Sequence, residues 1–216
     1  MKQAHGTLVS LAVILAAVLV GPAGPAYAAD HSVSGSTTNE IHQLILVASA
    51  AQCDPSNGDV SNPDDPNWVC RYAIRGHYKD TSADKFLGSG RVNGRFTFNT
   101  NSFNGTIGGS GCFLASAGVV KFTDKSGNLI RFKIDRTAST VCQTWDGTTD
   151  GPDGVRTEPT RTTHWLLKTT KGGCVGTFCG AKGNLTWDST ATFDSANPTL
   201  FRYLDVAQFE GTVSDP

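Results

Sequence analysis

The stretch VVKFTDKSGNLIRFKI, residues 119–134, contains two apolar segments separated by a polar turn. In the second segment Arg131 and Lys133 alternate with apolar residues, which is the period of a strand with one buried face. The first segment offers Val120 and Phe122 as a matching apolar face. The stretch therefore predicts an antiparallel hairpin, and we take it as the starting point for the fold.

The register of this hairpin depends on its loop. Directly opposed residues share a face, so the loop must contain an odd number of residues. A loop at 126–128 with Asn128 left-handed pairs Phe122 with Phe132, Val120 with Ile134, and Cys112 with Cys142. A loop at 125–127 with Gly127 left-handed has better turn residues but places the cysteines on a diagonal, about 7 Å or more apart. We favour the first register because a disulfide needs closely opposed cysteines.

The first 28 residues have the three parts of a secretory signal peptide. These are Lys2 near the start, an apolar run over residues 8–20, and the small-residue cleavage pattern Ala26-Tyr27-Ala28. The alternative is an uncleaved anchor, but the run is shorter than the roughly 20 residues of a membrane span. The sequence thus predicts a bacterial exported protein, secreted and extracellular, with no membrane span in the mature chain.

Composition favours strands and limits the partners. The net charge is −1 and no basic run occurs, which argues against nucleic acid and anionic membrane surfaces. Glycine is abundant and no long helical period follows the signal, as in proteins built from short strands and turns. We expect residues 29–39 to form a flexible lead-in and residues 40–216 one all-β domain of nine to eleven strands. That domain is a single antiparallel β-sandwich or β-barrel.

Six cysteines in an exported chain predict disulfides. Sequence order favours three sequential bonds, Cys53 with Cys70, Cys112 with Cys142, and Cys174 with Cys179. The alternative, zinc held by thiolates, lacks a C-x-x-C pair.

A polar loop between the first two cysteines is a candidate calcium site. Calcium takes six to eight oxygen ligands, and this loop offers several side-chain oxygens at short intervals. The candidate ligands are Asp54, Asn57, Asp59, Asp64 and Asp65. The spacing does not match an EF-hand, so a solvated turn is the alternative. No other cofactor is expected.

No catalytic residues can be assigned from motifs, since the chain has neither G-x-S-x-G nor H-E-x-x-H. Trp145, His77 and His164 are candidate ligand-binding residues, because Trp145 borders a second acidic loop and the histidines lie in predicted strands. The predicted function is a secreted, non-catalytic β-domain that binds a small ligand, a glycan or a protein partner. The alternative is an extracellular hydrolase that uses carboxylates with His77 or His164.

Overall fold

The computed structural model describes residues 28–43, 69–99, 104–105, 110–144, 160–194 and 202–216, and the structural statements below refer to these. They contain nine strands and the short 3-10 helix η4 (Gly176–Phe178). The strands are β1 (Asp30–Gln43), β2 (Val69–Asp80), β3 (Ser89–Asn99), β4 (Gly111–Asp124), β5 (Leu129–Ile134), β6 (Thr140–Thr144), β7 (Thr160–Thr169), β8 (Lys182–Phe193) and β9 (Arg202–Ser214).

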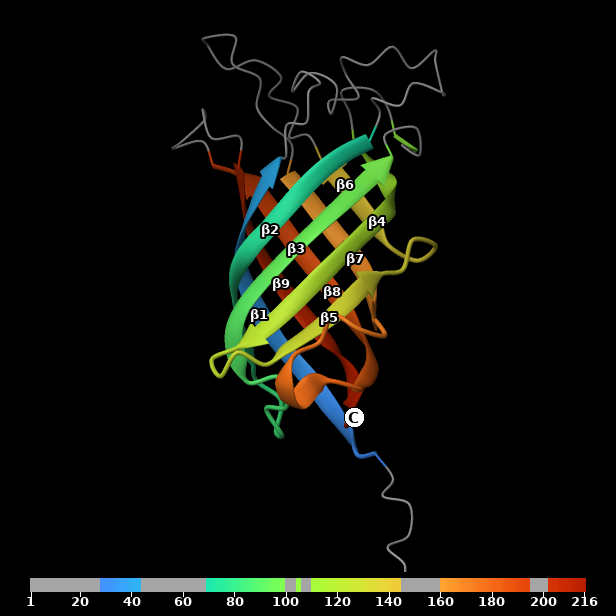
Figure 1. Cartoon of the computed structure of the whole chain (residues 1–216). Helices are drawn as coiled ribbons and strands as arrows, with labels where there is room; N and C mark the ends of the chain where they lie inside the picture. Colours follow the sequence, from blue (N-terminus) through green and yellow to red (C-terminus); the bar gives the residue numbers. More distant parts are fainter. Residues whose placement is uncertain (1–27, 44–68, 100–103, 106–109, 145–159, 195–201) are drawn as a thin grey trace, which may run out of the picture.

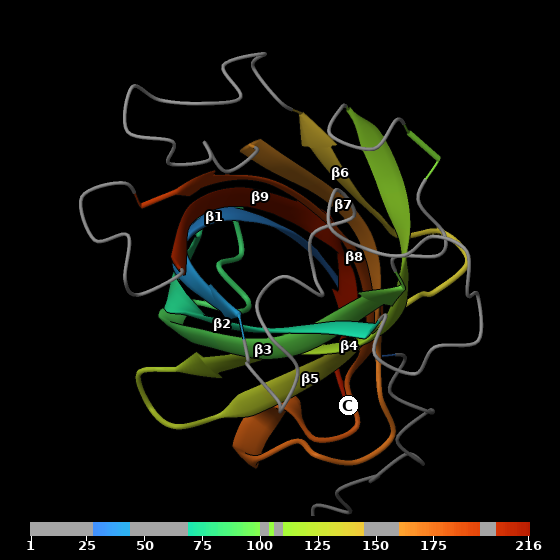
Figure 2. The same ribbon diagram turned by 90° about the horizontal axis from the view of Figure 1, so that it is seen from above.

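The strands form a closed antiparallel barrel with eight strand positions (Figure 2). Strands that follow one another in the sequence are paired from β1 to β5 and again from β7 to β9. Strand β9 pairs with β1, which closes the barrel. The remaining position is shared by β5 and β6, each of which lies between β4 and β7. The domain is therefore a barrel and not a sandwich, and closure leaves the sheet without an exposed edge.

The two ends of the barrel differ (Figure 1). Strands β1, β3, β6 and β8 end, and strands β2, β4, β7 and β9 begin, at one end of the barrel, which we call the loop end. At the other end, the terminal end, are the β2–β3, β4–β5 and β7–β8 connections. The start of β1 and the end of β9 also lie there, where Asp30 is opposite Ser214.

Aromatic side chains fill the barrel interior. Alternate residues of each strand point inward, as the period of a strand requires. Trp165 on β7 is directly opposite Trp187 on β8, and the two stacked rings are fully buried with centroids 6.1 Å apart. Phe122, Phe132 and Phe209 complete this aromatic core. The interior is narrow, since a side chain at the inward-facing Gly118 would overlap Ile134.

The β4–β5 hairpin has the second of the two registers considered from the sequence. Phe122 is opposite Ile130 and Val120 is opposite Phe132, so the register that we favoured is wrong. The turn places Gly127 in the left-handed region, with φ of 87°. Both sets of apolar residues nevertheless face the interior as predicted.

The favoured register failed because Cys112 and Cys142 do not belong to that hairpin. Strand β5 ends at Ile134, the chain turns at residues 135–139, and β6 pairs with β4 in a register shifted by two residues. Cys112 is therefore opposite Cys142, and the two are disulfide-bonded. The disulfide was predicted correctly from an incorrect register.

The predicted flexible lead-in is also wrong. Residues 30–39 lie in β1, which pairs with β2 on one side and with β9 on the other. Threonine suits strands because its branched side chain packs well on a pleated surface, and Val33 and Thr37 are buried inside the barrel. Strand β1 continues past the predicted lead-in as far as Gln43, where this described range ends.

Two of the three predicted disulfides are confirmed, Cys112–Cys142 and Cys174–Cys179. The third involves Cys53, which lies outside the described residues, as do residues 1–27 of the predicted signal peptide. Within the described ranges, no helix has the length and apolar character needed to cross a membrane.

Candidate functional site

Five of the polar side chains that point into the barrel in its half nearer the loop end form a group. They come from four strands and each is at most 7% exposed. Thr37 and Asn39 lie on β1, Asp205 on β9, Ser189 on β8 and Thr163 on β7. We call these five residues the interior polar cluster. Burial of polar groups is costly unless they are hydrogen-bonded, so each of these side chains is expected to have hydrogen-bond partners.

Strand register brings the members of the cluster together. Asn39 is opposite Asp205 in the β1–β9 pair, and its Nδ2 donates to Asp205 Oδ2 at 2.7 Å. The same Nδ2 donates to Thr37 Oγ1 at 2.7 Å. Thr163 is opposite Ser189 in the β7–β8 pair, and their hydroxyl oxygens lie 2.6 Å apart.

Several buried polar atoms in the interior have no hydrogen-bond partner among the described residues. The atoms are Asn39 Oδ1, Asp205 Oδ1, the indole Nε1 of Trp165 and of Trp187, and Gln143 Nε2. Most buried polar atoms in proteins are paired, and an unpaired one costs about 1–3 kcal/mol. Acceptors and donors without partners therefore occur in the same interior, which is what a polar ligand requires.

Burial raises the pKa of the Asp205 carboxyl, and the side chains of Asn39 and Ser189 act in the opposite direction. The dominant cause is the loss of solvation of the charged form. A carboxyl with a raised pKa holds a proton at higher pH than usual, and can then donate a hydrogen bond as well as accept one.

Arg161 closes the interior toward the loop end. The Cζ atom of its guanidinium lies 4.5 Å from the ring centroid of Tyr203 and 5.5 Å from that of Tyr72. Its Nη1 also donates to the Tyr72 hydroxyl at 3.0 Å. A cavity of about 10 Å³ borders these three residues and Thr163 of the interior polar cluster. That volume holds one water molecule at most, so side chains fill the rest of this region.

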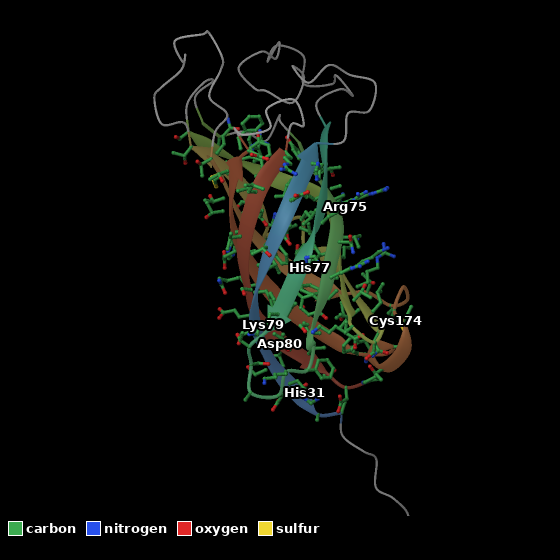
Figure 3. All side chains as sticks on the ribbon, turned by 90° about the vertical axis from the view of Figure 1, so that its left-hand side faces the viewer. His31, Arg75, His77, Lys79, Asp80 and Cys174 are labelled. Carbon is green, nitrogen blue, oxygen red and sulfur yellow. A yellow bond between two sulfur atoms is a disulfide. The ribbon has the colours of Figure 1, made fainter. Side chains whose placement is uncertain are left out.

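The histidines predicted to bind ligand lie on the outside of the barrel and apart from each other. His77 is exposed on the outer face of β2 (Figure 3). His164 is on the outer face of β7, and its Nδ1 lies 2.6 Å from Asp188 Oδ1 on β8. Strands β2 and β7 are not neighbours, so the structure does not bring these histidines together.

The other predicted site residues lie outside the described residues. These are Trp145 and the candidate calcium ligands Asp54, Asn57, Asp59, Asp64 and Asp65. Among the residues that the structure does describe, no group of three or more His, Cys, Asp or Glu side chains could hold a metal ion. The calcium site stays a prediction.

Sequence reasoning missed the interior polar cluster and Arg161. One signal was present for Asp205, because it shares the inward alternation of β9 with Tyr203, Ala207 and Phe209. An acidic residue at a position with the period of the core is a candidate buried site. Asn39 gave no such signal, since it was assigned to the lead-in.

Comparison of the chain with protein-family models, with curated proteins and with solved structures gave no match.

Proposed function

We propose that the protein is an exported, non-catalytic barrel that binds a small polar ligand inside its loop end. The observation that supports this most directly is the buried Asn39–Asp205 pair, in which each residue keeps one oxygen without a hydrogen-bond partner. Barrels of eight strands are wide enough for packed side chains or for one small ligand. Export is supported by the predicted signal peptide, and two disulfides fit an oxidising compartment.

The residues at the loop end define the chemistry of the ligand. Asn39 Oδ1 would accept a hydrogen bond from the ligand, and the Asp205 carboxyl would accept or donate one according to its protonation. The Arg161 guanidinium lies over the rings of Tyr72 and Tyr203 and borders this region toward the loop end. A small molecule with an N–H or O–H donor fits the two oxygens of Asn39 and Asp205. Since the cavity holds one water at most, Arg161 must move when this ligand enters.

A thermal-shift screen of small amides, sugars and carboxylic acids tests the proposal. Saturation at a hundredfold excess over the dissociation constant stabilises the folded state by about 2.7 kcal/mol. We expect compounds that raise the melting temperature of the wild type and have a much smaller effect on Asn39→Ser. The matched control is Asn93→Ser, at an exposed position on the outside of β3. A screen without active compounds, or equal shifts in both variants, would contradict the proposal.

The alternative of an extracellular hydrolase has weaker support. His164 and Asp188 resemble a base and the carboxylate that orients it, but their side chains are 54% and 59% exposed. Neither residue lines the small cavity beside Arg161 or the two depressions of about 620 and 690 Å³ on the barrel. A catalytic base needs a site that holds substrate within hydrogen-bond reach. We therefore favour the binding function.

A further inference from the structure

One wall of the barrel, made by β2, β3, β4 and β5, carries basic side chains on its outer surface. These four strands lie side by side in both views (Figures 1 and 2). The cations that point outward from them include Arg75, Arg91, Arg95, Lys121, Arg131 and Lys133. We call these six residues the basic face. The outward positions of the same strands contain no Asp or Glu.

Strand register arranges these cations in rows across the wall. The first row, in strand order, consists of Arg75, Asn93, Lys121 and Arg131. The second contains Arg95, Val119 and Lys133. Neighbouring strands are about 4.8 Å apart and successive outward residues about 6.7 Å apart, so the positive charges follow one another at short steps. Figure 3 shows Arg75, His77 and Lys79 one after another along β2, in the direction from the loop end to the terminal end.

The basic face includes an open depression of about 690 Å³ over β3, β4 and β5. Its polar lining residues are Tyr72, Asn93, Arg95, Thr97, Lys121 and Arg131. No acidic residue lines it. The depression therefore offers cations and hydrogen-bond donors to a ligand with negative charges.

A second basic depression, of about 620 Å³, adjoins the first at Arg131. Its charged lining residues are Arg131, Lys168, Lys171 and Lys182, again without an acidic residue. Lys168 is engaged with Asp135, at 2.7 Å, so Lys171 and Lys182 are the cations available there. Arg131 lines both depressions, and its buried Nε donates no hydrogen bond within the described structure. The two depressions thus form one basic track with Arg131 at the junction.

We propose that this basic track binds an extended anionic polysaccharide. Two successive depressions fit a linear polymer better than a compact ligand. The polymer would contact Arg95 and Lys121 in the first depression, pass over Arg131, and contact Lys171 and Lys182 in the second. The net charge of the chain is −1, so attraction to a polyanion comes from this local surface and not from the whole molecule.

Other polyanions fit the track less well. Proteins that bind single-stranded nucleic acid stack bases on aromatic rings, and apart from His77 the outward positions of β2 to β5 for which side chains are described carry none. A bilayer surface is flat and does not follow a hollowed track. A polysaccharide with a negative charge on each sugar needs neither stacking nor a flat surface.

Affinity measurements with defined polymers test this proposal. The probes are dextran sulfate and polygalacturonate, with neutral dextran of the same length as the control. We expect both anionic polymers to bind, with affinity that falls as salt rises because salt screens exposed charges. Neutral dextran should not bind. Tighter binding to single-stranded or duplex DNA, or to vesicles of anionic lipid, than to either polysaccharide would overturn the assignment.

Variants then locate the binding surface. Arg131→Gln should weaken dextran sulfate binding by about two- to fivefold, the loss of one charged contact near the surface. The control Arg136→Gln makes the same change at an exposed residue that lines neither depression, and should leave affinity unchanged. Lys121→Gln combined with Lys182→Gln removes one cation on each side of the junction and should weaken binding further. Equal affinity in the wild type and this double variant would refute the proposal, provided that melting temperatures agree.

Discussion

Asn39 Nδ2 and Asp205 Oδ2 lie 2.7 Å apart inside the barrel, across the contact between β1 and β9. This contact joins the first strand to the last and closes the barrel. One hydrogen bond therefore connects two polar residues that are 166 positions apart and at most 5% exposed. Loss of either partner leaves the other buried and without its hydrogen bond.

Asn39→Ala removes both donated hydrogen bonds of this amide. It should lower the free energy of unfolding by about 2–3 kcal/mol, because Asp205 and Thr37 stay buried without that donor. Urea denaturation at neutral pH measures the change. Asn93→Ala, on the outer surface of β3, should change stability by at most about 0.5 kcal/mol. Equal effects of the two substitutions would show that the buried pair adds no stability.

Asp205→Asn should change how stability depends on pH. Burial raises the pKa of Asp205, so the folded state holds its proton more tightly than the unfolded state does. The resulting stability is fully present below the unfolded pKa, near 3.8, and is lost as pH rises through the folded pKa. Asparagine does not titrate, so the variant does not lose this stability as pH rises. The melting temperature of the variant minus that of the wild type should therefore increase from pH 4 to pH 8. A constant difference would contradict the raised pKa.

Asp135 should affect stability at acid pH in the opposite sense. Its pKa is lowered to about 2, first by the hydrogen bond from Lys168 and then by those from Thr137. Its contribution is present above the unfolded pKa and is lost as pH falls toward 2. The melting temperature of the wild type minus that of Asp135→Asn should therefore shrink between pH 5 and pH 2. Thermal scans between pH 5 and pH 2 measure this difference. A difference that grows as pH falls would contradict the lowered pKa of Asp135.

The two confirmed disulfides should differ in their effect on stability. Cys112–Cys142 joins residues 30 positions apart, whereas Cys174–Cys179 joins residues 5 apart. A longer closed loop restricts the unfolded chain more, so the chain-entropy estimate is about 3.7 kcal/mol for the first bond and about 2.2 kcal/mol for the second. Replacement of each pair by alanine, followed by urea denaturation, compares them. A greater loss for Cys174→Ala with Cys179→Ala would contradict this order.

The sequence predicted which residues of each strand face the interior better than it predicted which strands pair with each other. The alternation around Phe132 assigns the buried face of β5 whatever the register, because the side-chain period is two. The β4–β5 register depends on the turn residues, which favour the loop with Gly127 in the left-handed conformation. The disulfide indicated the wrong register because Cys142 lies on β6, which pairs with β4 after a separate turn. Polar Ser and Thr residues concealed β1, since composition alone does not separate an outward-facing strand residue from a flexible one.

The candidate sites depend on contacts between distant parts of the chain. The interior polar cluster forms only when β1 meets β9 and β7 meets β8. The basic face likewise combines one or two cations from each of β2, β3, β4 and β5, so the absence of a basic run in the sequence concealed it. Sequence separation hid both sites, while residue type and alternation would have identified Asp205 as unusual.

The start of β1 and the end of β9 are held together at the terminal end of the barrel. Asp215 N donates to the carbonyl of Ala29 at 2.9 Å, and His31 Nε2 lies 3.0 Å from Asp215 Oδ1. A short linker could therefore join these ends, and new ends could be opened in the exposed turn at Ser126 and Gly127, giving a circular permutant with the same strand pairing. Attachment to a solid support or a fusion partner at residue 216 would likewise leave the loop end pointing away from the attachment point.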